Sequence, residues 1–473
     1  MFALFLLILP PENKYGVRYK NYIGYGIAIV VASVAILRAM HQLPTITIAG
    51  VQLRGVDMLS QLRSVPTPSD DSIAIVAPPT KKQAYVDSCP EGVKCIDDYS
   101  TDECGMLPLY HALHNVKGLN RPVRIAVMGD SYIEGDILTG ELREMLQKRF
   151  GGCGVGFVPM ANESHGFRRT VLHNFNGWTE HSAVTPHGYH ASNASIPGYY
   201  FTPSSGAYTE VRGQKKYCSL LDSCHTASIL FRSLIPNTIT VTTNGTLTNE
   251  YAIDGSNRIQ HISVNGRLGK VRFRITNGGD SVMCYGVTMD PRSGVILDNY
   301  ALRASSGEQL RNLSHEMLSQ LNQLRHYDLV ILMYGLNVAN TQQTNYSKYH
   351  DKMCLVINHL KQAMPNTGFL VVSVADREEN VDGVMKTMRG IKQLIAEQQH
   401  IAADEGVAFW NMFEAMGGTG SIVKMVNERP RKANLDYTHI NHLGGRQMAK
   451  YLYDAIIAGY DNYLRRLSYE AEY

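Results

Sequence analysis

The sequence predicts an α/β protein whose parallel β-sheet domain is interrupted by a β-rich insert. In residues 104–166 and 291–473, short apolar runs alternate with stretches in which apolar residues recur at helical spacing. This alternation is typical of a parallel sheet that is covered by helices on both faces. Residues 167–290 instead combine runs of alternating polarity with Asn-Gly pairs, which is typical of β-hairpins. We therefore expect one domain in two sequence parts, with a second unit between them.

The composition is that of a globular protein. The chain has 473 residues, of which 44% are hydrophobic and 18% are charged, and this length is enough for two or three domains. The formal net charge is +3 and no long basic run follows the N-terminal region, which argues against a nucleic-acid partner. The eight cysteines include no CxxC pair, so neither a disulfide scaffold nor a zinc ribbon is expected.

Residues 23–37 form an apolar run that is interrupted only by Ser33. Three basic residues precede this run: Lys14, Arg18 and Lys20. The pattern predicts an uncleaved, single-pass anchor within residues 1–40, which places the chain beyond Arg38 outside a bacterial inner membrane, facing the periplasm or the cell exterior. A cleaved signal peptide is the alternative, but Arg38 interrupts the small-residue pattern of a cleavage site. A buried core helix is the second alternative.

Residues 41–103 are predicted to link the anchor to the folded body. They include the stretch VPTPSDD and a Pro-Pro pair, both typical of a tether. In an exported protein, the spacing of Cys89 and Cys95 suits a small disulfide loop, whereas free buried thiols are an equal alternative. Residues 106–116 then have the pattern of a short helix that leads into the first strand of the sheet.

The central stretch of the chain is residues 123–150. Residues 123–128 have the pattern of a buried parallel strand, and from Ile137 onward the apolar positions fall at helical spacing. Gly129-Asp130-Ser131 lies between the two. A serine at the carboxyl end of such a strand has its hydroxyl at the mouth of the sheet and its N–H where an anion would develop. Ser131 is therefore a candidate nucleophile, with a helix-capping role as the alternative.

The insert is expected to be a β-sandwich. Residues 238–242 and 271–276 alternate strictly between apolar and polar side chains, as half-buried strands do. Cys218 and Cys224 are spaced for a second local disulfide. Four aromatic residues suit either a sugar-stacking platform or, as is more usual in small sandwiches, the core: Trp178, Tyr199, Tyr200 and Phe201.

The parallel pattern resumes after the insert. Strands are predicted at residues 294–298, 329–334, 369–374 and 407–410, and helices at 310–324, 346–364, 391–405 and 445–459. Functional groups in such sheets gather at the carboxyl ends of the strands. Four residues stand there or in the loop before the last helix: Gly307, Asn337, Asp436 and His439.

Four short motifs follow one another in the chain: Gly-Asp-Ser, a loop glycine, Gly-Leu-Asn and Asp-Tyr-Thr-His. Their order resembles the four sequence blocks of the SGNH (GDSL-like) hydrolases. The chain is most similar to the peptidoglycan O-acetylesterase branch, in which a carbohydrate-binding-like β-module interrupts the fold. The resemblance covers about residues 106–460 and implies a flavodoxin-like three-layer hydrolase domain. It implies a catalytic triad of Ser131, His439 and Asp436. It also implies an oxyanion hole made by the N–H groups of Ser131 and Gly307 and the side-chain amide of Asn337.

These residue types are sufficient for ester hydrolysis without a metal or an organic cofactor. Serine is unreactive at neutral pH unless a histidine takes its proton. Asp436 has the spacing from His439 that lets a carboxylate bind the second ring nitrogen, so His439 rather than His442 is the expected base. Ser131 does not lie in a GxSxG elbow, which disfavours an α/β-hydrolase.

We expect a membrane-anchored esterase that removes O-acetyl groups from a cell-envelope glycan, with peptidoglycan as the expected substrate and an acyl-serine intermediate. One alternative is a glycan O-acetyltransferase that uses the same triad. The other is a glycan-binding protein with a degenerate hydrolase domain. The glycan, the position of the ester and the oligomeric state are left open by the sequence.

Overall fold

The computed structural model describes residues 28–33, 35, 46–48, 51–53, 85–101 and 105–471. The chain forms two compact units, Met1–Gln83 and Ala84–Tyr473. In the first unit, residues 28–33 are helical, and the strands β1 (Ile46–Ile48) and β2 (Val51–Leu53) pair antiparallel.

The expected membrane anchor lies mostly outside the described residues. Of residues 23–37, the structure describes only 28–33 and 35, all as helix. None of the helices in the described part of the chain combines the length and the apolar character that crossing a membrane requires. The anchor therefore stays a prediction.

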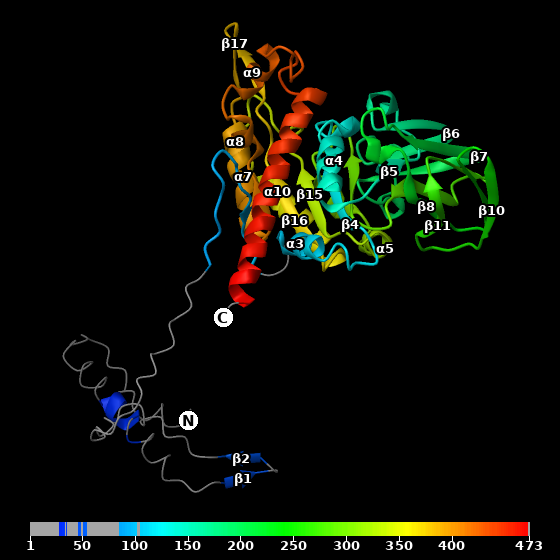
Figure 1. The fold of residues 1–473 in the computed structure, drawn as a ribbon. Helices are drawn as coiled ribbons and strands as arrows, with labels where there is room; N and C mark the ends of the chain where they lie inside the picture. Colours follow the sequence, from blue (N-terminus) through cyan, green and yellow to red (C-terminus); the bar gives the residue numbers. More distant parts are fainter. Residues whose placement is uncertain are drawn as a thin grey trace, which may run out of the picture. The chain divides into compact units, whose positions relative to one another are not determined.

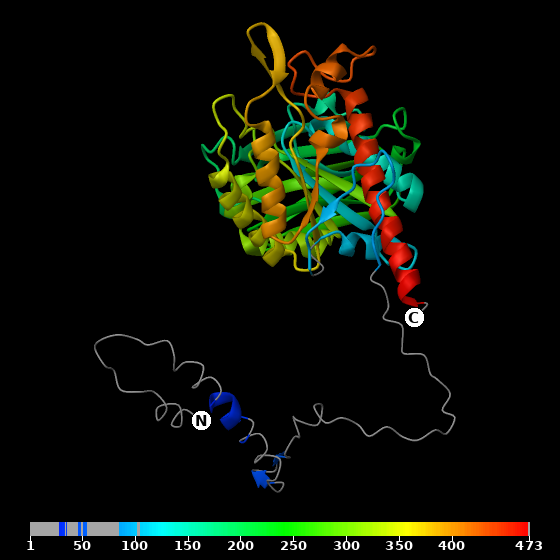
Figure 2. The ribbon, with the colours of Figure 1, turned by 90° about the vertical axis from the view of Figure 1, so that its left-hand side faces the viewer.

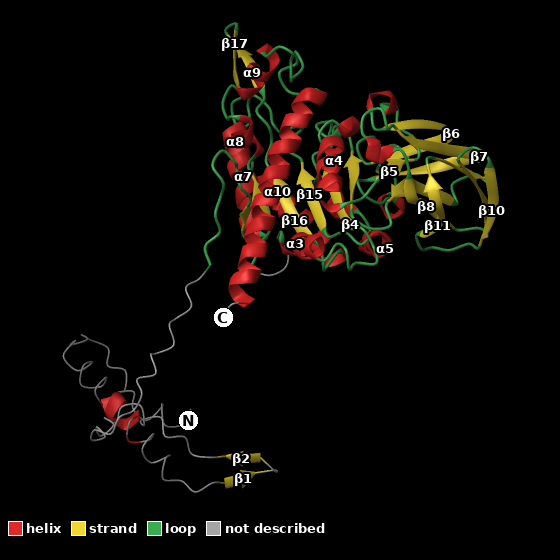
Figure 3. Cartoon of the chain, viewed as in Figure 1, coloured by secondary structure: helices red, strands yellow, loops and turns green. Residues whose placement is uncertain are grey.

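The second unit contains a six-stranded sheet in the order β14-β4-β15-β16-β19-β3. Its strands are β14 (Val295–Ala301), β4 (Val123–Gly129), β15 (Leu329–Met333), β16 (Gly368–Val372), β19 (Ala408–Trp410) and β3 (Asp97–Asp98). Figures 1 and 3 show three of these strands, β4, β15 and β16, side by side. All neighbours pair parallel except β3, which pairs antiparallel with β19 at the edge. The five parallel strands have the flavodoxin-like order, as expected, with the first strand, β4, beside the point where the order reverses.

Helices cover both faces of this sheet, which gives three layers. On one face lie α3 (Leu107–His114), α4 (Thr139–Phe150) and α10 (His442–Ala471), and on the other α5 (His315–Arg325), α6 (Ser347–Ala363) and α7 (Ile391–Asp404). Figure 2 shows α7 and α10 on opposite sides of the strands. Two short helices, α8 (Met412–Met416) and α9 (Ser421–Asn427), precede α10.

Helix α10 is longer at both ends than the expected 445–459. It begins at His442 because Asn441 caps it: the Asn441 Oδ1 atom accepts the N–H of Leu443 at 2.9 Å and of Gly444 at 3.3 Å. Helix α4 begins at Thr139, two residues later than the apolar spacing suggests, since Glu134–Asp136 forms a separate 3₁₀ turn.

The insert forms one nine-stranded antiparallel sheet between α4 and β14. Its strands are β5 (Gly156–Pro159), β6 (Val171–Ser182), β7 (Tyr199–Gly213), β8 (Cys224–Ser233), β9 (Asn237–Thr243), β10 (Leu247–Ile253), β11 (Gln260–Leu268), β12 (Lys270–Ile275) and β13 (Val282–Asp290). Strands β9 and β12 confirm the two strands predicted from alternation. The two-layer sandwich and the exact boundaries of the insert stay predictions.

The cysteine and aromatic expectations have different outcomes. Cys89 and Cys95 form the expected disulfide. The second disulfide was wrong: Cys218 and Cys224 are free and buried, and the Cys224 thiol donates instead to the carbonyl of Thr226. Of the two interpretations of the aromatic residues, the core is confirmed for three of the four, because Tyr199, Tyr200 and Phe201 are buried and do not form an exposed sugar-stacking platform. Trp178 is half-buried, and its indole N–H donates to the carbonyl of Tyr208 at 2.8 Å.

Candidate active site

Ser131 lies on the turn that leaves β4, at the carboxyl edge of the sheet. The turn is held by the side chain of Asp130, whose Oδ1 atom accepts the N–H of Tyr132 at 2.9 Å. The Leu302 N–H donates to the carbonyl of Gly129 at 2.9 Å, which fixes the end of β4 against the loop after β14. The N–H of Ser131 makes no hydrogen bond with another residue in the described part of the chain. It is thus free to act as a donor.

The structure brings the three predicted triad residues together. The Oγ atom of Ser131 is 3.0 Å from Nε2 of His439, and Nδ1 of His439 is 2.8 Å from Oδ2 of Asp436. Both distances are within hydrogen-bond range, so the three side chains form a continuous chain from the serine hydroxyl to the carboxylate. The side chain of His439 is 37% exposed, which leaves the site open to a bulky substrate.

The carboxylate of Asp436 is organised by its own loop. Its Oδ1 atom accepts the backbone N–H groups of Thr438 and His439, both at 3.0 Å, while Oδ2 faces the imidazole. Partial burial alone would raise the pKa of Asp436, but the hydrogen bonds from His439 and Thr438 outweigh burial and lower it. An ionised Asp436 fixes the tautomer of His439 that leaves Nε2 free to take a proton.

The other two residues predicted for the oxyanion hole already donate hydrogen bonds to other residues. Asn337 lies in the loop after β15, and its Nδ2 atom donates to Oδ2 of Asp130 at 3.0 Å and to the carbonyl of Ser305 at 2.9 Å. Gly307 lies in the loop after β14 with φ of 85°, and its N–H donates to Oγ of Ser305 at 3.0 Å. A Cβ atom at Gly307 would meet the Tyr334 ring at 2.8 Å, so the loop needs glycine there. Both donors thus lie near the carboxyl edge of the sheet, but each already donates a hydrogen bond to another residue.

Sequence reasoning missed the role of Asp130. This carboxylate is buried and links the Ser131 turn to the Asn337 side chain. Burial raises the pKa of Asp130 to about 6, although the Tyr132 N–H, the charge of His439 and the Asn337 amide all lower it. The sequence gives no signal for this role, because it depends on a contact with Asn337, which is distant in the chain.

Asp136 was also missed, and it joins the loop after Ser131 to helix α4, strand β14 and the insert. Its carboxylate accepts hydrogen bonds from five side chains in α4, β14 and the insert: Thr139, Arg143, Arg168, Thr170 and Asn299. Burial would raise its pKa, but the two arginine charges and the hydrogen bonds lower it well below the usual aspartate value. Asp136 is therefore ionised at neutral pH and fixes the insert against the catalytic sheet.

Arg377 follows β16 and holds the loop that carries Asn337. Its Nη1 atom donates to the carbonyls of Leu336, at 3.1 Å, and Ala339, at 3.4 Å, on either side of Asn337. We expect Arg377→Met to lower kcat for a small acetyl ester by about 10–100-fold, because releasing this loop displaces an oxyanion donor. The exposed Arg389→Met is the matched control and should keep wild-type kcat. An Arg377→Met enzyme with normal kcat would show that the Asn337 loop does not depend on Arg377.

The next residue, Glu378, contacts the loop that carries His439. It begins a hairpin of β17 (Glu378–Val381) and β18 (Val384–Thr387), and its N–H donates to the carbonyl of Tyr437 at 3.1 Å. Its side chain is buried, and its Oε2 atom has no partner among the described residues. Burial, and then the charge of Asp376, raise the pKa of Glu378 to about 7. This hairpin was not predicted, although Asp382-Gly383 is a hairpin signal.

The raised pKa of Glu378 predicts a pH-dependent stability. The protonated form is favoured in the folded state, so this stabilisation is fully present below about pH 4.5 and is lost as the pH rises through 7. Glu378→Gln mimics the protonated form. We expect this variant to be more stable than wild type at pH 8, by on the order of 1 kcal/mol, and equal to it at pH 4.5. Thermal unfolding at both pH values checks this, and equal melting temperatures at pH 8 would contradict it.

No metal centre is apparent in the part of the chain that the structure describes. Groups of three or more histidine, cysteine, aspartate or glutamate side chains that could hold an ion are absent from it. The Ser131–His439–Asp436 chain is suited to nucleophilic attack on an ester by general-base catalysis, because each member is at the position that its role requires.

Comparison with known proteins identifies the fold. No protein-family model matches the chain, and no curated protein matches it significantly. A solved structure described as a peptidoglycan O-acetylesterase "in action" is similar, with 22% identity, a TM-score of 0.65, and coverage of 77% of this chain and 99% of that one. This likeness shows a shared fold and confirms the resemblance at that level.

Two other solved structures are carbohydrate esterases. One belongs to carbohydrate esterase family 3, from Talaromyces cellulolyticus, with 15% identity, a TM-score of 0.27, and coverage of 35% of this chain and 72% of that one. The other is an acetyl xylan esterase, with 17% identity, a TM-score of 0.26, and coverage of 34% and 81%. TM-scores this low do not establish a common arrangement.

Proposed function

We propose that this chain, which has the fold of the SGNH hydrolases, is a serine esterase that removes O-acetyl groups from a cell-envelope glycan. The observation that carries the proposal is the alignment of Ser131, His439 and Asp436 at the carboxyl edge of the sheet, with distances of 3.0 and 2.8 Å along the chain. The exposed imidazole of His439 suits a polymeric substrate better than a small buried one.

In the first half-reaction, Nε2 of His439 takes the proton of Ser131 while Oγ bonds to the acetyl carbonyl carbon. The carbonyl oxygen becomes an oxyanion, which the N–H of Ser131 stabilises. Gly307 and Asn337 contribute further donors once they exchange their present partners for the oxyanion. Each such donor is worth about 10²–10³ in rate. The carbon–oxygen bond to the sugar then breaks, and the sugar oxygen takes the proton from His439.

The second half-reaction restores the enzyme. His439 takes a proton from water, the hydroxide bonds to the acetyl carbon of acetyl-Ser131, and the bond to Oγ breaks. Acetate leaves, and Ser131 regains its proton from His439. Asp436 stabilises the imidazolium in both halves, since it is ionised and hydrogen-bonded to Nδ1.

Peptidoglycan is the glycan we propose, because the fold is shared along most of the chain with a protein described as a peptidoglycan O-acetylesterase. Acetate release from O-acetylated peptidoglycan and from acetylated xylan tests this choice. We expect kcat/KM on peptidoglycan to exceed that on xylan. The reverse order would still support an esterase but would contradict peptidoglycan as its substrate. Transfer of acetyl to a glycan acceptor in the same assay, with no free acetate, would instead identify an acetyltransferase.

Membrane attachment is a separate part of the proposal and is supported by the sequence alone. The apolar run 23–37 after Lys14, Arg18 and Lys20 would anchor the chain in the inner membrane with the catalytic domain outside. The protein should resist a carbonate wash of membranes and be cleaved by protease added from the outer side. Release into the soluble fraction as a shortened chain would indicate a cleaved signal peptide instead.

A further inference from the structure

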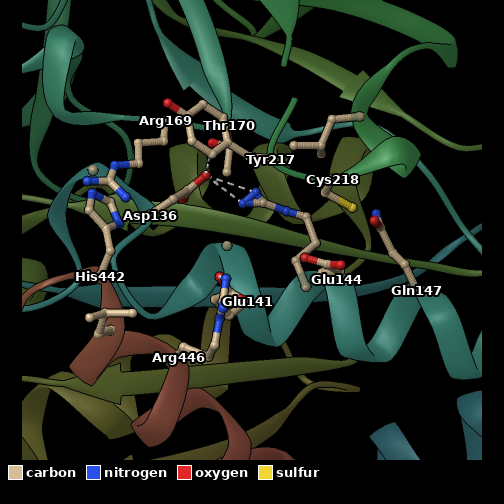
Figure 4. Close-up of a pocket in the computed structure, with 15 residues that line it drawn as sticks. Asp136, Glu141, Glu144, Gln147, Arg169, Thr170, Tyr217, Cys218, His442 and Arg446 are labelled. Atoms are coloured by element: carbon tan, nitrogen blue, oxygen red, sulfur yellow. Dashed lines mark hydrogen bonds and ion pairs between the residues drawn. The ribbon is translucent and has the colours of Figure 1, made fainter. Parts of the chain in front are cut away.

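A cavity of about 100 Å³ lies where α4, the first turn of α10 and the insert meet (Figure 4). Helix α4 lines one side, His442 and Arg446 project from α10, and Arg169 and Tyr217 project from the insert. The cavity adjoins the catalytic loops, because Gly135 on its wall closely follows Ser131 in the chain and His442 closely follows His439. Two parts of its wall thus continue directly from the segments that carry Ser131 and His439.

Every carboxylate that lines this cavity already has a basic partner. Asp136 binds Arg143, and also Arg168 outside the cavity. Glu141 accepts from Arg446 at 2.9 Å, and Glu144 pairs with Lys148 at 2.5 Å.

Arg169, by contrast, has no ion pair with any residue in the described part of the chain. Its guanidinium lies 6.0 Å from the ring centre of Tyr217 and faces the imidazole of His442 in Figure 4. Burial, and then the charge of Arg169, lower the pKa of His442. The charges of Glu141 and Asp136 act in the opposite direction and raise it. The buried Nε atom of Arg143 also has no acceptor among the described residues.

These contacts favour an anionic ligand of low charge. A guanidinium presents paired N–H donors that match a carboxylate, and the exposed Tyr217 ring beside it offers an apolar surface. A phosphate would carry more charge into a cavity that Glu141 and Glu144 also line, so its repulsion from them would be larger. The charge balance of the cavity therefore suits a single carboxylate.

We propose that this cavity is a substrate subsite in which Arg169 binds a carboxylate of the glycan polymer, in a unit next to the acetylated one. The inference rests on the proposed function, because it assigns the carboxylate to that substrate. It also gives the insert a role: Arg169 and Tyr217 come from the insert, whereas the catalytic residues come from the sheet domain.

Binding measured by calorimetry on the full chain tests the subsite. The probes are a de-O-acetylated disaccharide–peptide fragment of peptidoglycan and an oligogalacturonide, each with free and with amidated carboxylates. Wild type should bind the free-carboxylate form of at least one probe about tenfold more tightly than the amidated form. Arg169→Gln should reduce this preference to within about twofold, because the charge-assisted contact that distinguishes the two forms of the probe is lost. The matched control is Lys216→Gln, since Lys216 lies over the same Tyr217 ring but outside the cavity.

Lys216→Gln should keep the full preference for the free carboxylate, and all three proteins should unfold at the same temperature. Equal binding of free and amidated probes by wild type, or a full preference in Arg169→Gln, would overturn the subsite. Failure of the esterase proposal is separately visible: wild type would release no acetate from a small acetyl ester or a glycan while still preferring free carboxylates in calorimetry.

Discussion

Replacing His439 with alanine is expected to lower kcat for a small acetyl ester by about 10⁴–10⁶-fold. The Nε2 atom of His439 is 3.0 Å from the Ser131 hydroxyl, and without it the described structure holds no base at hydrogen-bond distance from that hydroxyl. Ser131→Ala should lower kcat by the same factor. Because the two residues act as a unit, the double variant should be scarcely slower than either single variant. Hydrolysis of 4-nitrophenyl acetate by proteins with wild-type circular dichroism gives these rates.

His442 and Asp436 provide the internal comparisons for this result. His442→Ala should lose far less activity than His439→Ala, because the His442 ring faces Arg169, whereas the Ser131 hydroxyl is hydrogen-bonded to His439. Asp436→Asn should lower kcat about 10⁴-fold, which is less than the loss of the histidine, since the serine, the base and the oxyanion donors remain. A folded His439→Ala enzyme with near-normal turnover would refute the triad.

Asp136→Ala should be the most destabilising substitution near the site, by about 3–5 kcal/mol. It leaves two charged guanidinium groups, Arg143 and Arg168, without the carboxylate that they share, and the Arg143 side chain is almost fully buried. Because the pKa of Asp136 is lowered, its stabilisation is present at neutral pH and is lost as the pH falls below the usual aspartate value. The difference between wild type and variant should therefore shrink in acid.

The matched control for Asp136 is Asp461→Ala. Asp461 pairs at 3.1 Å with Arg149, an arginine of the same helix α4, but both of these side chains are exposed. Removing that ion pair should lower the free energy of unfolding by less than about 1 kcal/mol. Urea unfolding at pH 7 compares the two variants. Equal losses would mean that the buried network around Asp136 does not hold the insert to the sheet domain.

Much of the fold could be predicted because its signals are local. The strand 123–128 is a continuous apolar run, and its neighbours in the sheet have the same character, so their burial is evident from the residues themselves. The parallel order then follows from the alternation with helices. The Asp436–His439 pair is equally local, since both residues lie in one loop. Ser131 was predicted because it follows the end of a strand pattern and precedes a segment with helical spacing.

The remaining features depend on contacts between distant residues. The partners of Asp136 come from α4, β14 and the insert, and no local pattern indicates that they meet. The separation of Cys218 and Cys224 fits a disulfide, but Cys218 lines the cavity beside α4 whereas Cys224 begins β8 and bonds to Thr226. The hydrogen bond from Asn337 to Asp130 likewise forms only because β4 and β15 lie side by side.

Covalent labelling of Ser131 tests the central claim most directly. A fluorophosphonate reacts with a serine only when a nearby base activates the hydroxyl, so mass spectrometry of the labelled full-length protein reports the nucleophile itself. We predict one labelled peptide, containing Ser131, with labelling abolished in Ser131→Ala and strongly slowed in His439→Ala. Labelling at another residue, or an unlabelled Ser131 in folded wild-type protein, would contradict a serine esterase built on Ser131, His439 and Asp436.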